Sequence, residues 1–109
     1  MTTPNRRGPG ATFWYIVGYG NPNCQGDAVW SEGGSSNQCT DARTLAASYA
    51  WVAGQDTRIN TWVVPDFCTA QVTGRPVYVV SNTITMDGAT GKHGCVDNAA
   101  VGGYEVVLL

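Results

Sequence analysis

Four cysteines are the residues of this chain best suited to chemistry, and that chemistry is disulfide formation. They are Cys24, Cys39, Cys68 and Cys95, in a chain of 109 residues. A zinc site is disfavoured, because no two cysteines are separated by two residues and the only histidine is His93. Two disulfides in so short a chain are typical of secreted proteins. We therefore expect an extracellular protein with no metal and no cofactor.

The chain contains one set of residues whose types would allow acid–base catalysis. Glu105 as base, His93 as acid and Arg75 on a phosphate are the residue types that a small secreted ribonuclease needs. The match is to residue types alone, and His93 stands in a glycine-rich stretch where an exposed histidine is the ordinary outcome. We expect no catalytic residues and no enzyme, with the ribonuclease kept as an alternative.

An internal repeat governs the organisation of the chain. An aromatic residue, a proline and a cysteine follow one another at similar spacing in both halves: Tyr19, Pro22 and Cys24, then Trp62, Pro65 and Cys68. Two copies of so short a unit predict two packed motifs in one domain. We place the domain at 12–109, with motifs at about 12–54 and 55–109, after a flexible arm at 1–11.

Three disulfide pairings are possible for four cysteines. The repeat favours pairing within each motif, Cys24 with Cys39 and Cys68 with Cys95.

Composition excludes several classes of partner. The net charge of −2 provides no basic surface for nucleic acid, and no apolar run approaches the ~20 residues of a membrane-spanning helix. Residues 1–11 lack the apolar core of a signal peptide, so we expect a mature protein with an added start methionine. Arg6 and Arg7 leave a dibasic processing site as the alternative.

Short β-branched and aromatic runs between turn residues predict an all-β fold with at most one short helix. The helix is expected at 41–47, capped by Thr40 or Asp41. Loops are expected at 31–38, 69–75 and 86–94. The predicted strands cover 13–17, 28–30, 49–52, 58–64, 77–80, 83–85 and 104–109.

The first motif resembles the Greek-key motif of the βγ-crystallins. Gly26 lies seven positions after Tyr19, and Ser48 opens a later strand. Cys24, just before that glycine, makes the chain similar to the small killer-toxin-like members. The resemblance covers roughly residues 13–109 and implies a β-sandwich of two Greek-key motifs. It also implies that Gly26 bends a hairpin through a positive φ, that Ser48 pins this hairpin, and that Trp62 takes the place of Tyr19 in the second motif.

The second motif departs from that pattern. Thr69 stands where the glycine is expected and Gly103 where the serine is expected, so we expect an enlarged hairpin between Cys68 and Gly74. The alternative is an unrelated β-sandwich with two disulfides. Asp97 and Asn98 form the kind of pair that binds calcium in this family, but no Ser or Thr follows them, and we expect weak or absent calcium binding.

The sequence thus predicts a secreted, non-enzymatic protein, killer-toxin-like or effector-like, that binds a cell-surface or cell-wall target. A lectin-like carbohydrate-binding module is the alternative. The four tryptophans could stack on sugars, but most are expected in the core; they are Trp14, Trp30, Trp51 and Trp62. The contact surface is expected at the 86–94 loop, with Lys92 and His93, and in the segment after Cys68.

Overall fold

The all-β prediction is confirmed. The computed structural model describes residues 13–63, 68 and 79–109, and the helical element whose bounds it describes is the 3-10 turn η1 (Pro22–Cys24). The strands are β1 (Trp14–Tyr19), β2 (Ala28–Gly34), β3 (Gln38–Ala53), β4 (Thr57–Trp62), β5 (Val80–Ile84) and β6 (Lys92–Leu108).

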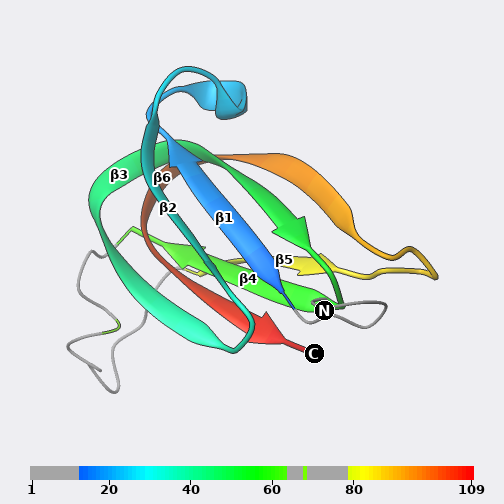
Figure 1. The fold of residues 1–109 in the computed structure, drawn as a ribbon. Helices are drawn as coiled ribbons and strands as arrows, with labels where there is room; N and C mark the ends of the chain where they lie inside the picture. The colour runs from blue at the N-terminus through cyan, green and yellow to red at the C-terminus, as the bar shows by residue number, and fades with distance from the viewer. Residues whose placement is uncertain (1–12, 64–67, 69–78) are drawn as a thin grey trace, which may run out of the picture.

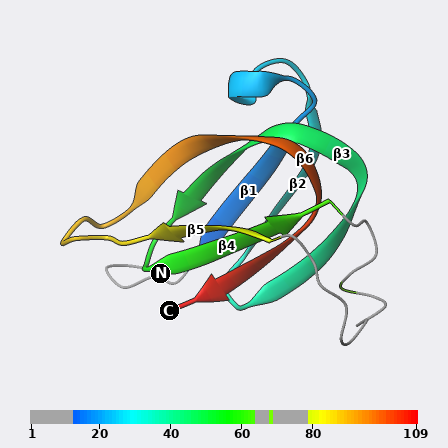
Figure 2. The same ribbon diagram turned by 180° about the vertical axis from the view of Figure 1, so that it is seen from behind.

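All six strands form one antiparallel sheet in the order β2-β1-β3-β6-β4-β5. The sheet folds over on itself, so that β1 and β2 lie on one side and β4 and β5 on the other (Figures 1 and 2). The two long central strands bend and join the two sides. They pair with each other along their length, and on the opposite edge the end of β3 also pairs with β1 and the end of β6 with β4.

The helix predicted at 41–47 is wrong, because this segment belongs to β3. Its pairing with β6 shifts register between Asp41 and Ala46 and again between Ala46 and Ser48. Ala42 and Ala46 are buried here. Helix propensity is a weak preference that tertiary pairing readily overrides. The strands predicted at 49–52 and 104–109 are the ends of β3 and β6, and Ser31–Gly34, predicted as loop, belongs to β2.

The two halves of the sheet have the same register. Tyr19 of β1 lies opposite Ser48 of β3, and Trp62 of β4 lies opposite Gly103 of β6. In both halves the third strand returns beside the first strand and not beside the second, as Greek-key connections do. The predicted repeat therefore corresponds to a common pattern of strand pairing.

The predicted disulfide pairing is wrong. The bonds are Cys24–Cys95 and Cys39–Cys68, so each joins the hairpin of one motif to the third strand of the other. β3 has 16 residues and runs for about 50 Å along its bent backbone, so that its two ends lie beside different motifs. Cys39, near its start, therefore lies opposite Glu105, beside the second motif, and Cys95 correspondingly lies opposite Ala50.

The loop between β1 and β2 is held from two strands. Gly26 has a φ of 83°, and the buried Ser48 Oγ accepts a hydrogen bond from the Cys24 N–H and donates one to the Asn21 carbonyl. These are the roles that the resemblance implies for Gly26 and Ser48. From β6, the Asp97 carboxylate accepts a hydrogen bond from the Asn23 N–H (2.6 Å). Asn23 and Cys24 also have positive φ, a costly conformation for residues with a Cβ, so these contacts hold the loop in place.

Every tryptophan lies across from a glycine on the neighbouring strand. The pairs are Trp14 with Gly34, Trp30 with Gly18, Trp51 with Gly94, and Trp62 with Gly103. A Cβ at these glycines would lie 2.2 to 3.0 Å from the nearest ring atom of the tryptophan. Each glycine therefore provides the space in which an indole lies flat on the sheet.

The core fills the space between the two sides of the folded sheet. Trp14 and Trp62 are buried, while Trp30 and Trp51 are half-buried at its margin. The largest fully buried side chains are those of Tyr49, Tyr104, Ile16, Val101 and Val106.

Removing either disulfide should lower stability by a similar amount. The bonds close 71 and 29 residues of chain, so the chain-entropy model assigns each about 4 kcal/mol. We expect Cys24→Ser/Cys95→Ser and Cys39→Ser/Cys68→Ser each to lose about that much free energy of unfolding in urea titrations.

Peptide mapping without reduction should link Cys24 to Cys95, and a Cys24–Cys39 peptide would contradict the fold described here.

Gly103→Ala should be strongly destabilising. The new Cβ would lie 2.2 Å from Nε1 of the buried Trp62, and such overpacking costs about 1–3 kcal/mol. Gly20→Ala is the matched control, because its nearest neighbour, Val29 Cγ1, is 3.6 Å away. Equal melting temperatures for the two variants would show that Trp62 does not depend on the space at Gly103.

Candidate functional site

Lys92 and His93 lie at the start of β6. The Lys92 ammonium donates a hydrogen bond to the Thr85 carbonyl and forms an ion pair with Asp87 (3.3 Å), so it ties the turn between β5 and β6. His93 is exposed and lies opposite Val52. Lys92 thus has a structural role at the turn, and contact with a target by either residue stays a prediction. The 69–75 loop lies outside the described residues.

The structure does not bring the nominal ribonuclease residues together. Glu105 lies twelve residues from His93 along β6 and accepts a hydrogen bond from Asn60 Nδ2 (3.1 Å). Arg75 lies outside the described residues. Asp97, half of the nominal calcium pair, is exposed and binds the Asn23 N–H, while the side chain of Asn98 is not described.

A groove of about 360 Å³ opens beside β2 and the first half of β3. This volume is at the lower end of the range for small-molecule sites, enough for one or two small rings. Most of the lining comes from β2 and β3, with one tyrosine from β6. The lining residues are Val29, Trp30, Ser31, Glu32, Thr40, Asp41, Ala42, Thr44 and Tyr104.

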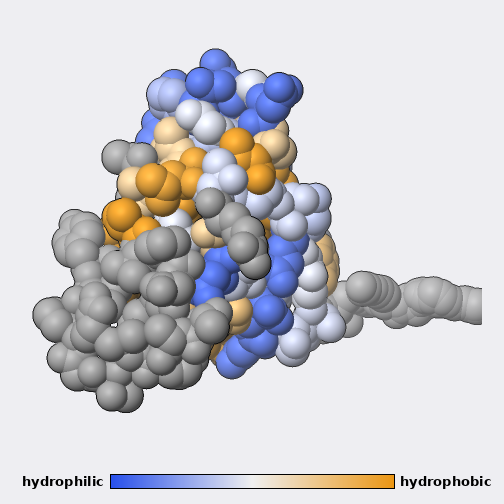
Figure 3. All heavy atoms as spheres, turned by 90° about the vertical axis from the view of Figure 1, so that its left-hand side faces the viewer, coloured by the Kyte–Doolittle hydropathy of each residue, from blue (hydrophilic) through white to orange (hydrophobic). Residues whose placement is uncertain are grey.

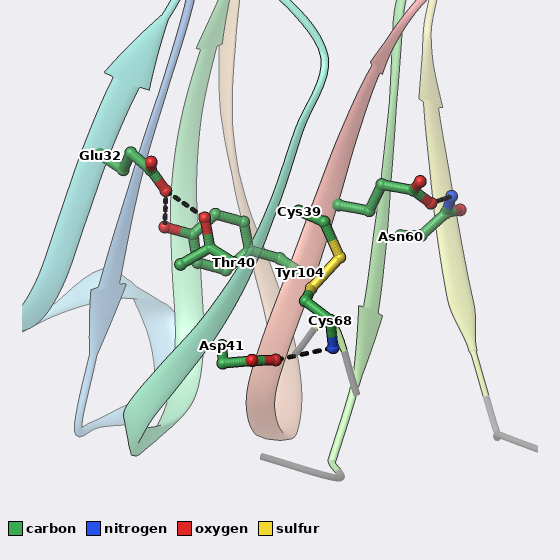
Figure 4. The surroundings of a disulfide bond; sticks show 8 residues. Glu32, Cys39, Thr40, Asp41, Asn60, Cys68 and Tyr104 are labelled. Carbon is green, nitrogen blue, oxygen red and sulfur yellow. Dashed lines mark hydrogen bonds between the residues drawn. A yellow bond between two sulfur atoms is a disulfide. The ribbon is translucent and has the colours of Figure 1, made fainter. Parts of the chain in front are cut away.

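Glu32 is the polar centre of the groove. Its Oε1 accepts hydrogen bonds from Thr40 Oγ1 (2.5 Å) and from the Tyr104 hydroxyl (2.6 Å). Figure 4 shows both hydroxyls directed at this carboxylate, and Asp41 directed at the backbone of Cys68, whose N–H it binds at 2.8 Å. The groove therefore holds two carboxylates fixed by the protein's own donors.

The aromatic wall of the groove is also fixed. The rings of Trp30 and Tyr104 stack with centroids 4.8 Å apart, and Trp30 Nε1 donates a hydrogen bond to the Thr44 carbonyl (3.0 Å). Burial raises the pKa of Tyr104 well above its ordinary value, and the hydrogen bond to Glu32 and the charge of Glu32 raise it further. Tyr104 is thus a neutral hydrogen-bond donor at any physiological pH.

An apolar surface adjoins the groove where β3 bends. Leu45 is 54% exposed and Val63 is 48% exposed, and both lie against Gly102. Figure 3 shows a band of apolar surface on this side of the molecule. We call the exposed residues Leu45 and Val63 the Leu45 patch. Exposed apolar surface beside polar groups is typical of interaction sites.

Sequence reasoning missed Glu32 because the sequence predicts a loop at 31–38. Trp30 and Glu32 are two positions apart, so a strand through Gly34 places them on one face. A second missed signal is Cys-x-Asp, at Cys39–Asp41 and Cys95–Asp97. In both copies the aspartate binds a backbone N–H of the hairpin to which its cysteine is bonded.

Comparison with models of protein families, with curated proteins and with solved structures found no match for this chain. The part of the chain that the structure describes contains no helix long and apolar enough to cross a membrane.

Stability should fall at high pH. Burial raises the pKa of Tyr49 from 10 to about 12, against the opposing effect of its hydrogen bond with Asn82. Because the folded-state pKa is raised, this stabilisation is complete below pH 10 and is lost as the pH rises from 10 to 12, by up to roughly 3 kcal/mol. Urea titrations at pH 9 to 12 should show this loss, and Tyr49→Phe should show a smaller one. An equally steep loss in Tyr49→Phe would contradict the assignment to Tyr49.

Proposed function

We propose that this protein is a secreted, non-enzymatic, killer-toxin-like or effector-like protein that acts by binding a target on a cell surface or cell wall. The Leu45 patch, next to a groove with a fixed aromatic wall, is the observation that carries the proposal.

Two disulfides in a small β-protein fit an extracellular location. Both bonds connect the two motifs, so the hairpins and the central strands are locked together. A rigid scaffold that presents a fixed surface loses little conformational entropy on binding. This property suits a protein that acts outside the cell through recognition.

The arrangement of the polar groups supports binding over bond chemistry. His93 and Glu105 lie twelve residues apart on β6, and one oxygen of each carboxylate, Glu32 Oε1 and Asp41 Oδ1, accepts hydrogen bonds from donors of the protein. A general base must reach the proton that it removes, and these groups are held by structural contacts.

A lectin-like module is the second candidate, and the half-buried Trp30 beside the Glu32 carboxylate favours it. Sugar-binding sites combine an aromatic ring with polar groups that fix orientation.

Leu45→Ser should weaken binding to target cells without lowering the melting temperature. Leu109→Ser is the matched control, because Leu109 is equally exposed (52%) but lies at the end of β6, by a second hollow that includes Gln55 and Met86. We expect at least a tenfold loss of cell binding for Leu45→Ser, measured with labelled protein on fungal and bacterial cells together with growth inhibition. Growth inhibition should fall in parallel.

If only Leu109→Ser lost binding, the target would contact the second hollow and not the Leu45 patch. Binding to none of the cells by the wild type, or turnover of a substrate such as RNA, would overturn the proposed function.

A further inference from the structure

We propose that the groove at Glu32 binds the ammonium group of an amino sugar, a ring that carries a free amine. This inference rests on the proposed function, because it names the chemical class of the cell-surface target. It follows from three features of the groove: the hydrogen-bonding character of its lining, its charge and its apolar wall.

The charged groups of the lining that the structure describes are two carboxylates, Glu32 and Asp41, which accept hydrogen bonds. The Trp30 N–H is bound to the Thr44 carbonyl, and the hydroxyls of Thr40 and Tyr104 are bound to Glu32. The remaining donors among the described lining side chains are the hydroxyls of Ser31 and Thr44. A ligand that fits this groove must therefore supply donors, and an ammonium group supplies three and accepts none.

The charge of the groove points the same way. Glu32 and Asp41 line it, and none of the lining residues that the structure describes is Lys or Arg. The side chain of Arg43 lies outside the described part of the chain. A half-buried carboxylate attracts a cation more strongly than an exposed one, because less water screens the pair. A neutral hydroxyl gains less from the same site.

The shape of the groove selects a ring over a flexible chain. Trp30, Val29 and Ala42 line a space of about 360 Å³. The C–H groups of a pyranose ring can pack on such a wall while its amine contacts Glu32. A lysine side chain offers the same amine but only a narrow methylene stem for this wall.

The test uses the intact disulfide-bonded protein and two tetrasaccharides that differ only in charge, β-1,4-linked glucosamine and its fully N-acetylated form. Titration calorimetry and tryptophan fluorescence should show binding of the glucosamine tetramer and at least tenfold weaker binding of the acetylated one. Equal affinities for the two sugars, or no binding of either, would overturn the inference.

Two pairs of variants locate the site. Glu32→Gln removes the charge and keeps the shape, and should weaken binding at least tenfold. Glu105→Gln removes the same charge from a glutamate that is bound to Asn60 instead, and should change affinity less than twofold. Ser31→Lys places a cation at an exposed lining position and should abolish binding, while Ser81→Lys, at an exposed position of β5, should not. Equal affinities within either pair would overturn the assignment to this groove.

A lysine-containing peptide distinguishes the source of the amine. If it competes and glucosamine tetramers do not, the partner is a protein and the amino-sugar inference is wrong. If cells are bound through Leu45 but glucosamine tetramers neither bind nor compete, this inference fails and the proposed function stands. If the tetramers bind through Glu32 but no cells are bound, the proposed function fails and this inference stands.

Discussion

The pairing of β3 with β6 is the constraint on which the rest of the structure depends. They pair with each other across the middle of the sheet, and each also pairs at its end with the first strand of its own motif. Because they cross from one motif to the other, they bring the start of each third strand beside the opposite hairpin. The disulfides, the contacts of Asp41 and Asp97, and the groove all follow from this crossing.

The tryptophan–glycine pairs show how a chain with few leucines and isoleucines builds its core. Large rings bury much apolar area, but a flat sheet has no room for them unless the facing residue is small. Gly18, Gly34, Gly94 and Gly103 provide that room. Gly103 stands where the resemblance implies a serine, and the second motif uses the space for the Trp62 ring. Equivalent positions of the two motifs thus contribute differently: Ser48 makes hydrogen bonds, and Gly103 leaves space for the Trp62 ring.

The groove is a product of the same geometry. Trp30 and Glu32 come from β2, Thr40 from the start of β3, and Tyr104 from the second motif. They meet only because β3 carries its first residues across to β6. The Leu45 patch lies where β3 bends and its pairing with β6 shifts register. The surface to which we assign function is therefore built at the junction of the motifs, where strand pairing is least regular.

The sequence by itself determined the all-β class, the two-fold repeat and the involvement of all four cysteines in disulfides, because these follow from local composition and spacing. Through the family resemblance it also indicated the positive φ of Gly26 and the hydrogen bonds of Ser48 to the hairpin, which lie within one motif. Only the tertiary structure decided the disulfide partners, the strand at 41–47 and the groove at Glu32. The physical reason is that each depends on how far β3 extends before it pairs. Alanine-rich residues 41–47 have a local preference for helix, and only the hydrogen bonds and burial supplied by β6, some fifty residues away in the chain, override that preference.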